Sequence, residues 1–119
     1  MSEILIFAEQ RFGSLDETTP ELITAARSFA EKKGAKVAVA ILGKSIKGFA
    51  DQLASLPVDL VISAEHDLLD QYTPDGYSKV ATSLIRERKP EVILIAHTYQ
   101  GMDLSPKIAA ALNIGMASN

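Results

Sequence analysis

The residue types that could do chemistry collect in two polar stretches, each of which follows a continuous apolar run. Residues 8–14 follow the run at 4–7, and residues 97–101 follow the run at 92–96. With the acid just beyond the second stretch, the candidate ligand-contacting residues are Glu9, Arg11, Gly13, His97, Tyr99, Gly101 and Asp103. Neither stretch contains the GxGxxG or Walker A pattern that cradles phosphate groups. The isolated glycines could present backbone amides to a ligand, although we favour turn geometry as their role.

Asp103 has a position that admits two roles. Apolar spacing predicts a last helix over residues 103–112. Asp103 itself, or Ser105 with Pro106 in the first turn, would cap the N-terminus of that helix. Alternatively, the Asp103 carboxylate would accept a hydrogen bond from a ribose hydroxyl or from an arginine of a partner. We favour the capping role.

No catalytic or metal-binding constellation emerges from the sequence. There are no cysteines, which excludes a thiol nucleophile, and only two histidines, His66 and His97. Glu65, His66 and Asp67 are adjacent, and adjacent side chains rarely converge on one ion. No carboxylate pair or nucleophile–base pair has a plausible spacing for acid–base or covalent catalysis. The sequence therefore predicts a binding or assembly module, with no catalytic residue and no metal, rather than an enzyme.

Composition and charge limit the class of protein further. The chain has 119 residues, of which 47% are hydrophobic and 23% charged, as expected for one globular domain. Its net charge of −3 disfavours nucleic-acid binding. The nearest basic cluster, Arg86, Arg88 and Lys89, is expected in the last turn of a helix.

Membrane and export signals are also missing from the sequence. The longest apolar run, residues 37–42, is far shorter than a membrane span. The first residues lack the basic segment that is typical of a signal peptide. We therefore expect a cytoplasmic location, or an equivalent one such as the mitochondrial matrix, and no membrane span.

Strand-like and helix-like segments alternate along the chain. Continuous apolar runs predict four buried strands, at residues 4–7, 36–42, 59–62 and 92–96. Helical spacing predicts helices that start at Thr19 with Pro20, near Ser45, at Thr73 with Pro74, and at Asp103. The first helix is expected to bury Leu22, Ala25, Ala26, Phe29 and Ala30. Residues 9–19 are expected to form a loop, and residues 65–72 a connection with one helical turn.

This alternation predicts a single α/β domain over residues 1–119, with a doubly wound, mostly parallel, Rossmann-like sheet in three layers (α/β/α). Right-handed crossovers favour the strand order 3-2-1-4. Ligands of such sheets bind where the order reverses, which here lies between the loops after the first and fourth strands. The seven candidate residues are therefore expected to line one crevice.

The last seven residues look like the approach to a further strand. If residues 114–117 do not cover it, the outer edge of the fourth strand stays unpaired, and such an edge favours association with another chain. An ending of this kind is compatible with a piece of a longer chain.

Four segments, at residues 4–9 (Ile-Leu-Ile-Phe-Ala-Glu), 72–77, 89–94 and 101–110, follow the pattern of a known family. Residues 4–9 resemble the first strand of the N-terminal domain of the electron transfer flavoprotein α subunit, and residues 72–77 and 89–94 are similar to the middle of that domain. Residues 101–110 (Gly-Met-Asp-Leu-Ser-Pro-Lys-Ile-Ala-Ala) resemble the family's Gly-Arg-Asp-Leu-Ala-Pro-Arg stretch, in register after the fourth strand. Met102 stands where the family usually has arginine.

This resemblance implies an electron-carrier subunit rather than a catalyst. The full-length family binds FAD in a C-terminal domain, so we expect no FAD on residues 1–119 alone. The implied partners are a β subunit, which holds the family's AMP site, and acyl-CoA or other flavoprotein dehydrogenases; self-association is the alternative to the β subunit. The alternative function is a stand-alone adenine-nucleotide-binding α/β domain. A phosphorelay receiver is disfavoured because Ser63 stands where its acceptor aspartate would be.

Overall fold

The fold is a four-stranded parallel sheet covered by two helices on each face. The computed structural model describes residues 2–11 and 13–112. The sheet contains β1 (Glu3–Phe7), β4 (Lys36–Gly43), β5 (Leu60–Glu65) and β6 (Val92–Ile95), in the order β5-β4-β1-β6. The helices are α1 (Thr18–Lys33), α2 (Lys47–Ala54), α3 (Pro74–Arg88) and α4 (Tyr99–Leu112). The predicted doubly wound architecture and its 3-2-1-4 order are confirmed.

Strand β1 is an inner strand of the sheet, and its side chains are buried on both faces. It pairs in parallel with β4, where Ile4 lies opposite Val37, and with β6, where Ile4 lies opposite Val92. Because side chains alternate along a strand, Ile4 and Ile6 face one layer of helices and Leu5 and Phe7 face the other. Continuous apolar runs are therefore required, as the sequence predicted.

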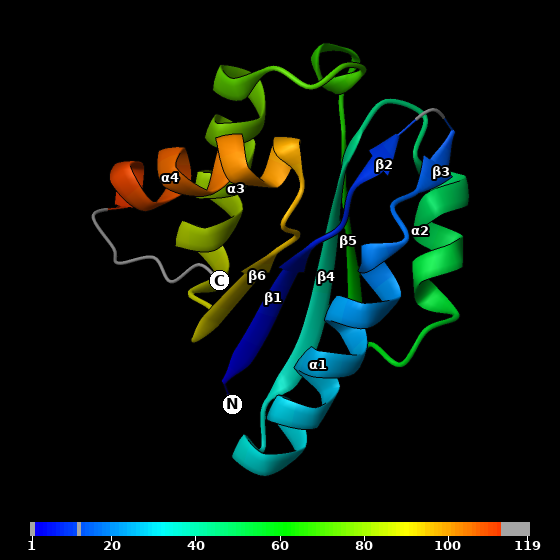
Figure 1. The fold of residues 1–119 in the computed structure, drawn as a ribbon, viewed down its shortest axis with the longest axis vertical. Helices are drawn as coiled ribbons and strands as arrows, with labels where there is room; N and C mark the ends of the chain where they lie inside the picture. The colour runs from blue at the N-terminus through cyan, green and yellow to red at the C-terminus, as the bar shows by residue number, and fades with distance from the viewer. Residues whose placement is uncertain (1, 12, 113–119) are drawn as a thin grey trace.

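Each face of the sheet has its own core. Ile23, Ala26 and Ala30 of α1, with Leu53 of α2, pack on one face. On the other face lie Tyr77, Ala81 and Ile85 of α3 and Leu104 and Ile108 of α4. Figure 1 shows α1 and α2 on one side of the strands and α3 and α4 on the other. This arrangement leaves the carboxyl ends of all four strands at one edge of the sheet.

The start of α1 differs from the prediction. Thr19 is buried and does not cap the helix, which begins at Thr18; instead, an Asp16 carboxylate oxygen accepts a hydrogen bond from the Thr18 backbone N–H. The buried face is correspondingly turned, so that Ile23 is buried while Phe29 is 41% exposed and Ala25 is exposed. The alanine-rich sequence of this helix is compatible with two overlapping apolar faces. Packing against the sheet determines which of the two faces is buried.

The segment after β1 also differs from the prediction. The expected loop over residues 9–19 contains a small antiparallel hairpin, made of β2 (Gln10–Arg11) and β3 (Ser14–Leu15). Gly13 lies in its turn with a φ of 79°, a conformation that favours glycine. Two residues per strand are too few to show the alternation of a strand, so the hairpin has no signature in the sequence.

Other local predictions are confirmed. Thr73 precedes α3 with Pro74 in the first turn, and the connection after β5 contains one 3-10 turn, η1 (Asp67–Leu69). Arg86 and Arg88 lie in the last turn of α3. Helix α2 begins two residues after Ser45, which has a φ of 56°. The expected further strand at residues 113–119 lies outside the described residues.

Candidate functional site

An open cleft lies at the carboxyl edge of the sheet, at the point where the strand order reverses. Its volume is about 690 Å³, within the range of small-ligand sites. The cleft is lined by Glu9, Gln10, Arg11, Asp70, Gln71, Tyr72, Tyr77, Tyr99, Gln100 and Asp103. The chain thus brings together the segment after β1, the connection after β5 and the first turns of α4.

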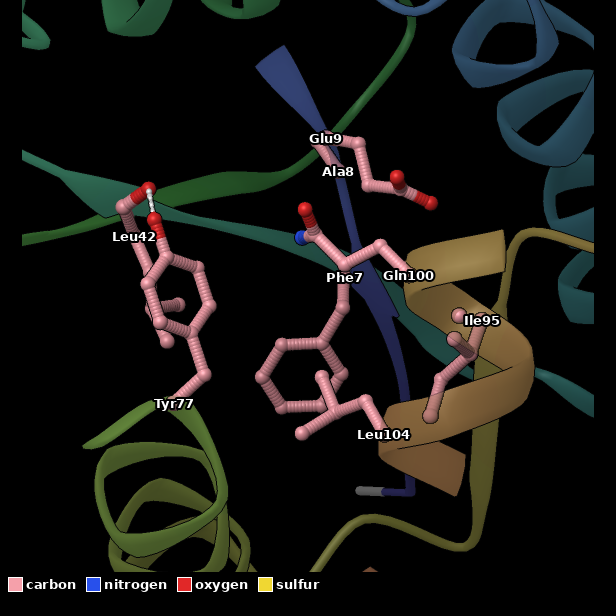
Figure 2. Close-up of a pocket in the computed structure, with 9 residues that line it drawn as sticks. Phe7, Ala8, Glu9, Leu42, Tyr77, Ile95, Gln100 and Leu104 are labelled. Carbon is pink, nitrogen blue, oxygen red and sulfur yellow. Dashed lines mark hydrogen bonds between the residues drawn. The ribbon is translucent and has the colours of Figure 1, made fainter. Parts of the chain in front are cut away.

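The predicted candidates divide between this cleft and its surroundings. Glu9, Arg11, Tyr99 and Asp103 line it. Gly101 instead lines a separate small, mostly apolar pocket. Figure 2 shows the side chains of Phe7, Ile95 and Leu104 that line the same pocket. Gly13 and His97 are exposed and line neither space.

Three lining residues that the sequence analysis did not select come from the connection after β5. Asp70, Gln71 and Tyr72 reach the cleft because all parallel strands end at the same edge of the sheet. These three residues could have been predicted from the sequence, because they lie between a predicted buried strand and the predicted start of a helix. Tyr77 was predicted to face inward on α3, and its ring also borders the cleft.

Thr98 links the segment after β1 to the start of α4. Its hydroxyl donates to Oε2 of Glu9 at 2.5 Å and accepts from the backbone N–H of Gly101 at 3.0 Å. Burial raises the pKa of the half-buried Glu9, an effect that the Thr98 hydrogen bond partly opposes. A carboxylate therefore already lies at the positive N-terminal end of α4, where an anionic ligand would otherwise be favoured.

Asp103 does not cap a helix, and the capping prediction is wrong. Helix α4 begins four residues earlier, at Tyr99, and continues through Pro106, while Thr98 provides the cap. The Tyr72 hydroxyl instead donates to Oδ2 of Asp103 at 2.6 Å, across the cleft. A partner that is 31 residues away in the sequence leaves no local signal.

Two tyrosines of the cleft, Tyr72 and Tyr77, are held in place by packing and hydrogen bonds. The Tyr72 and Tyr77 rings meet edge to face with centroids 5.0 Å apart, and the Tyr77 hydroxyl donates to the Leu69 carbonyl at 2.8 Å. Burial, followed by the Asp103 hydrogen bond, raises the pKa of Tyr72. Tyr72 therefore stays a neutral hydrogen-bond donor at physiological pH.

Gly101 allows α4 to approach the end of β6 closely. A Cβ atom at this position would lie 1.9 Å from the Ala96 carbonyl oxygen and 3.1 Å from Cγ2 of Ile95. No side chain fits there without moving the helix. Gly101 thus serves close packing, in addition to donating its N–H to Thr98.

The described residues limit what the cleft could hold. Among the described residues no group of three or more histidine, cysteine or acidic side chains is placed to hold a metal ion. The described part of the chain likewise contains no helix long and apolar enough to cross a membrane. Fold and cleft together define a doubly wound α/β domain with an acidic, tyrosine-lined cleft at its switch point.

Comparison with known proteins places this domain in a family. The family model of the electron transfer flavoprotein domain matches residues 4–119. The chain therefore belongs to the electron transfer flavoprotein domain family, as the resemblance predicted.

Individual relatives agree with this assignment. The chain is 39% identical over 117 residues to the electron transfer flavoprotein subunit alpha of Thermoanaerobacterium thermosaccharolyticum, a match that covers 98% of this chain and 36% of that protein. It is 38% identical over 116 residues to the subunit alpha of Clostridium acetobutylicum, covering 98% and 34%. The acryloyl-CoA reductase electron transfer subunit beta of Anaerotignum propionicum is 40% identical over 117 residues, covering 98% and 32%. The chain thus spans about a third of the length of the curated relatives it matches.

Proposed function

We propose that this chain acts as the N-terminal scaffold domain of an electron transfer flavoprotein α-type subunit. In this role it pairs with a β subunit in a complex that accepts electrons from flavoprotein dehydrogenases, acyl-CoA dehydrogenases among them. The observation that carries the proposal is the family match over residues 4–119, supported by relatives named subunit alpha. The domain is an assembly element and not itself a catalyst.

The described residues do not fit the flavin cofactor that the family name implies. FAD carries a pyrophosphate, which α/β domains bind at a helix N-terminus with closely packed backbone amides. Here the Glu9 carboxylate lies at the N-terminus of α4, held by Thr98, and Asp103 also lines the cleft. These acids repel a pyrophosphate, so we assign FAD to parts of the complex outside these residues.

The first experiment tests pairing. The chain is co-expressed with the β subunit of the Clostridium acetobutylicum electron transfer flavoprotein, and complexes are sized by light scattering. A 1:1 complex supports the proposal. A monomeric chain that ignores the β subunit contradicts it, and so does a chain that purifies alone with stoichiometric FAD absorbance.

The second experiment tests equivalence within the whole subunit. The matched segment of the Clostridium acetobutylicum subunit alpha, about a third of its length, is replaced by this chain. The chimera should bind the β subunit and FAD, whereas the subunit with this segment deleted should lose the β subunit. A chimera that behaves like the deletion would refute the scaffold role.

The second candidate function is that of a stand-alone adenine-nucleotide-binding domain. It is favoured by the position and volume of the cleft, because nucleotides bind α/β sheets at this edge. Calorimetric titration of the chain with AMP and with ATP tests it: submicromolar binding of either would support it over the scaffold role. The expected cytoplasmic location, or one in an equivalent compartment, remains a prediction, and fluorescence microscopy of a tagged chain tests it.

A further inference from the structure

The cleft at the carboxyl edge of the sheet contains an aromatic side chain that the scaffold role leaves unexplained. Tyr99 lines this cleft and is 87% exposed. Tyrosine is enriched at protein interfaces, where its ring provides contact area at little conformational cost. The neighbouring Met102 on α4 is also 53% exposed. This end of α4 therefore has the character of a contact surface.

The charge of the cleft specifies what it would contact. Its described lining includes three acids, Glu9, Asp70 and Asp103, and one base, Arg11. The ion pairs recorded among the described residues are Arg27–Asp59, Lys47–Asp51 and Arg88–Glu3. None of these pairs neutralises Asp70 or Asp103. The cleft is therefore complementary to a cationic group and repels phosphates and anionic lipid surfaces.

The Asp103 carboxylate is oriented so that it can accept a hydrogen bond from a cationic group. The Tyr72 hydroxyl donates to its Oδ2, which restricts the rotation of the carboxylate. Within the described part of the chain, Oδ1 accepts no hydrogen bond and remains available to a donor. A guanidinium combines planar N–H donors for a carboxylate with a flat face that stacks on tyrosine. An ammonium group lacks that flat face.

We propose that the cleft receives an arginine side chain of the partner subunit, which stacks on Tyr99 and donates hydrogen bonds to Asp103. This inference rests on the proposed scaffold function, because that function supplies the partner. Its occupant is a protruding arginine of the β subunit. A second copy of this chain is an outcome that the test must distinguish.

The first test uses the chain alone and does not depend on the partner. The chain is titrated with N-acetyl-arginine amide, and the backbone amides of Asp70, Tyr72, Tyr99 and Asp103 are followed by NMR. N-acetyl-citrulline amide, which has nearly the same shape without the charge, is the control. Saturable shifts at millimolar arginine, with several-fold smaller shifts from citrulline, are expected. Equal shifts from both ligands, or none up to 50 mM (a concentration on the order of 50 times a 1 mM Kd), would overturn the site.

The second test measures binding to the β subunit with matched variants. Asp103→Asn removes the charge and keeps an oxygen acceptor for Tyr72, and Tyr99→Ala truncates an exposed side chain. Asp51→Asn is the control, because the Asp51 side chain is 71% exposed on α2, away from the cleft lining, and its ion pair among the described residues is with Lys47 of the same helix. We expect each cleft variant to weaken binding about tenfold or more, as loss of a paired interfacial charge does, and Asp51→Asn to bind as the wild type does.

The two proposals fail in different ways. If the wild-type chain binds the β subunit and both cleft variants bind equally well, the scaffold role stands and the arginine site is refuted. If arginine amide binds but the β subunit does not, the assignment of the partner is refuted together with the scaffold role. If Asp103→Asn instead abolishes a homodimer seen by light scattering, the occupant is a second copy of this chain, and the partner assignment is wrong.

Discussion

Replacement of Gly101 by alanine tests whether close approach of α4 to β6 stabilises this end of the domain. The added Cβ would lie 1.9 Å from the Ala96 carbonyl oxygen, whereas carbon and oxygen atoms in contact lie about 3.3 Å apart or more. The helix must therefore move by roughly 1.4 Å, the difference between the two values. Ala96 is buried, so its carbonyl group cannot move away without disturbing the surrounding packing.

The magnitude follows from two opposing effects. Overpacking of this kind costs about 1–3 kcal/mol, and occasionally more. Alanine is a better helix former than glycine by about 1 kcal/mol in a helix interior, an advantage that is smaller in the first turn, where Gly101 lies. We therefore expect a net loss of about 1–2 kcal/mol.

Gly48 provides the matched control for this substitution. It lies in α2, and a Cβ there would meet no atom within 4 Å. Gly48→Ala should be neutral or stabilising by up to about 1 kcal/mol. The assay is urea unfolding, in which a changed midpoint with an unchanged slope reports stability. If Gly101→Ala is as stable as Gly48→Ala, the close-approach explanation is wrong.

Three further substitutions test other features of the fold. Thr19 is 1% exposed, and its hydroxyl has no hydrogen-bond partner in the described residues. Thr19→Val should therefore stabilise the domain by about 1 kcal/mol, because it removes this unpaired polar group, whereas Thr19→Ser should not. Equal stability of the two variants in urea unfolding would contradict this. Because burial raises the Glu9 pKa, the protonated form is favoured in the folded state, and stability is lost as pH rises through that pKa. Glu9→Gln should therefore exceed the wild type in stability at pH 7 and lose that advantage below the ordinary glutamate pKa of about 4.3; a pH-independent difference in thermal unfolding would count against it. Arg88 binds Glu3 through two hydrogen bonds, at 2.6 and 2.9 Å. A double-mutant cycle with the uncharged variants Arg88→Gln and Glu3→Gln should show a coupling of about 1 kcal/mol that falls in 1 M salt; a salt-independent value would exclude an ionic origin.

The acidic character of the switch point has a consequence for the family relationship. Domains of this architecture commonly bind phosphates at this edge of the sheet. Here Glu9 and Thr98 close the N-terminus of α4 with a resident carboxylate, while Tyr72 and Asp103 span the cleft. The charge of this cleft is thus unfavourable to a phosphate group and favourable to a cationic one, as the proposed arginine site requires.

The sequence by itself determined the four strands of the parallel sheet, their order and the edge at which a ligand could bind. Continuous apolar runs such as that of β4 are the local signature of burial on both faces. Alternation of strands with helices then restricts the sheet to a few right-handed arrangements. Four of the seven candidate residues, Glu9, Arg11, Tyr99 and Asp103, consequently line the cleft.

Only the tertiary structure decided the roles of individual side chains. Asp103 and Thr19 both have the residue types of helix caps, yet the first accepts a hydrogen bond from Tyr72 and the second is buried in the first turn of α1. The α4 start at Tyr99 likewise depends on Thr98, whose hydroxyl also reaches Glu9, 89 residues away. Periodicity reports how a segment packs, because burial repeats along the segment. A cap or a single hydrogen bond has no period, and its partner is fixed only when distant segments are brought together.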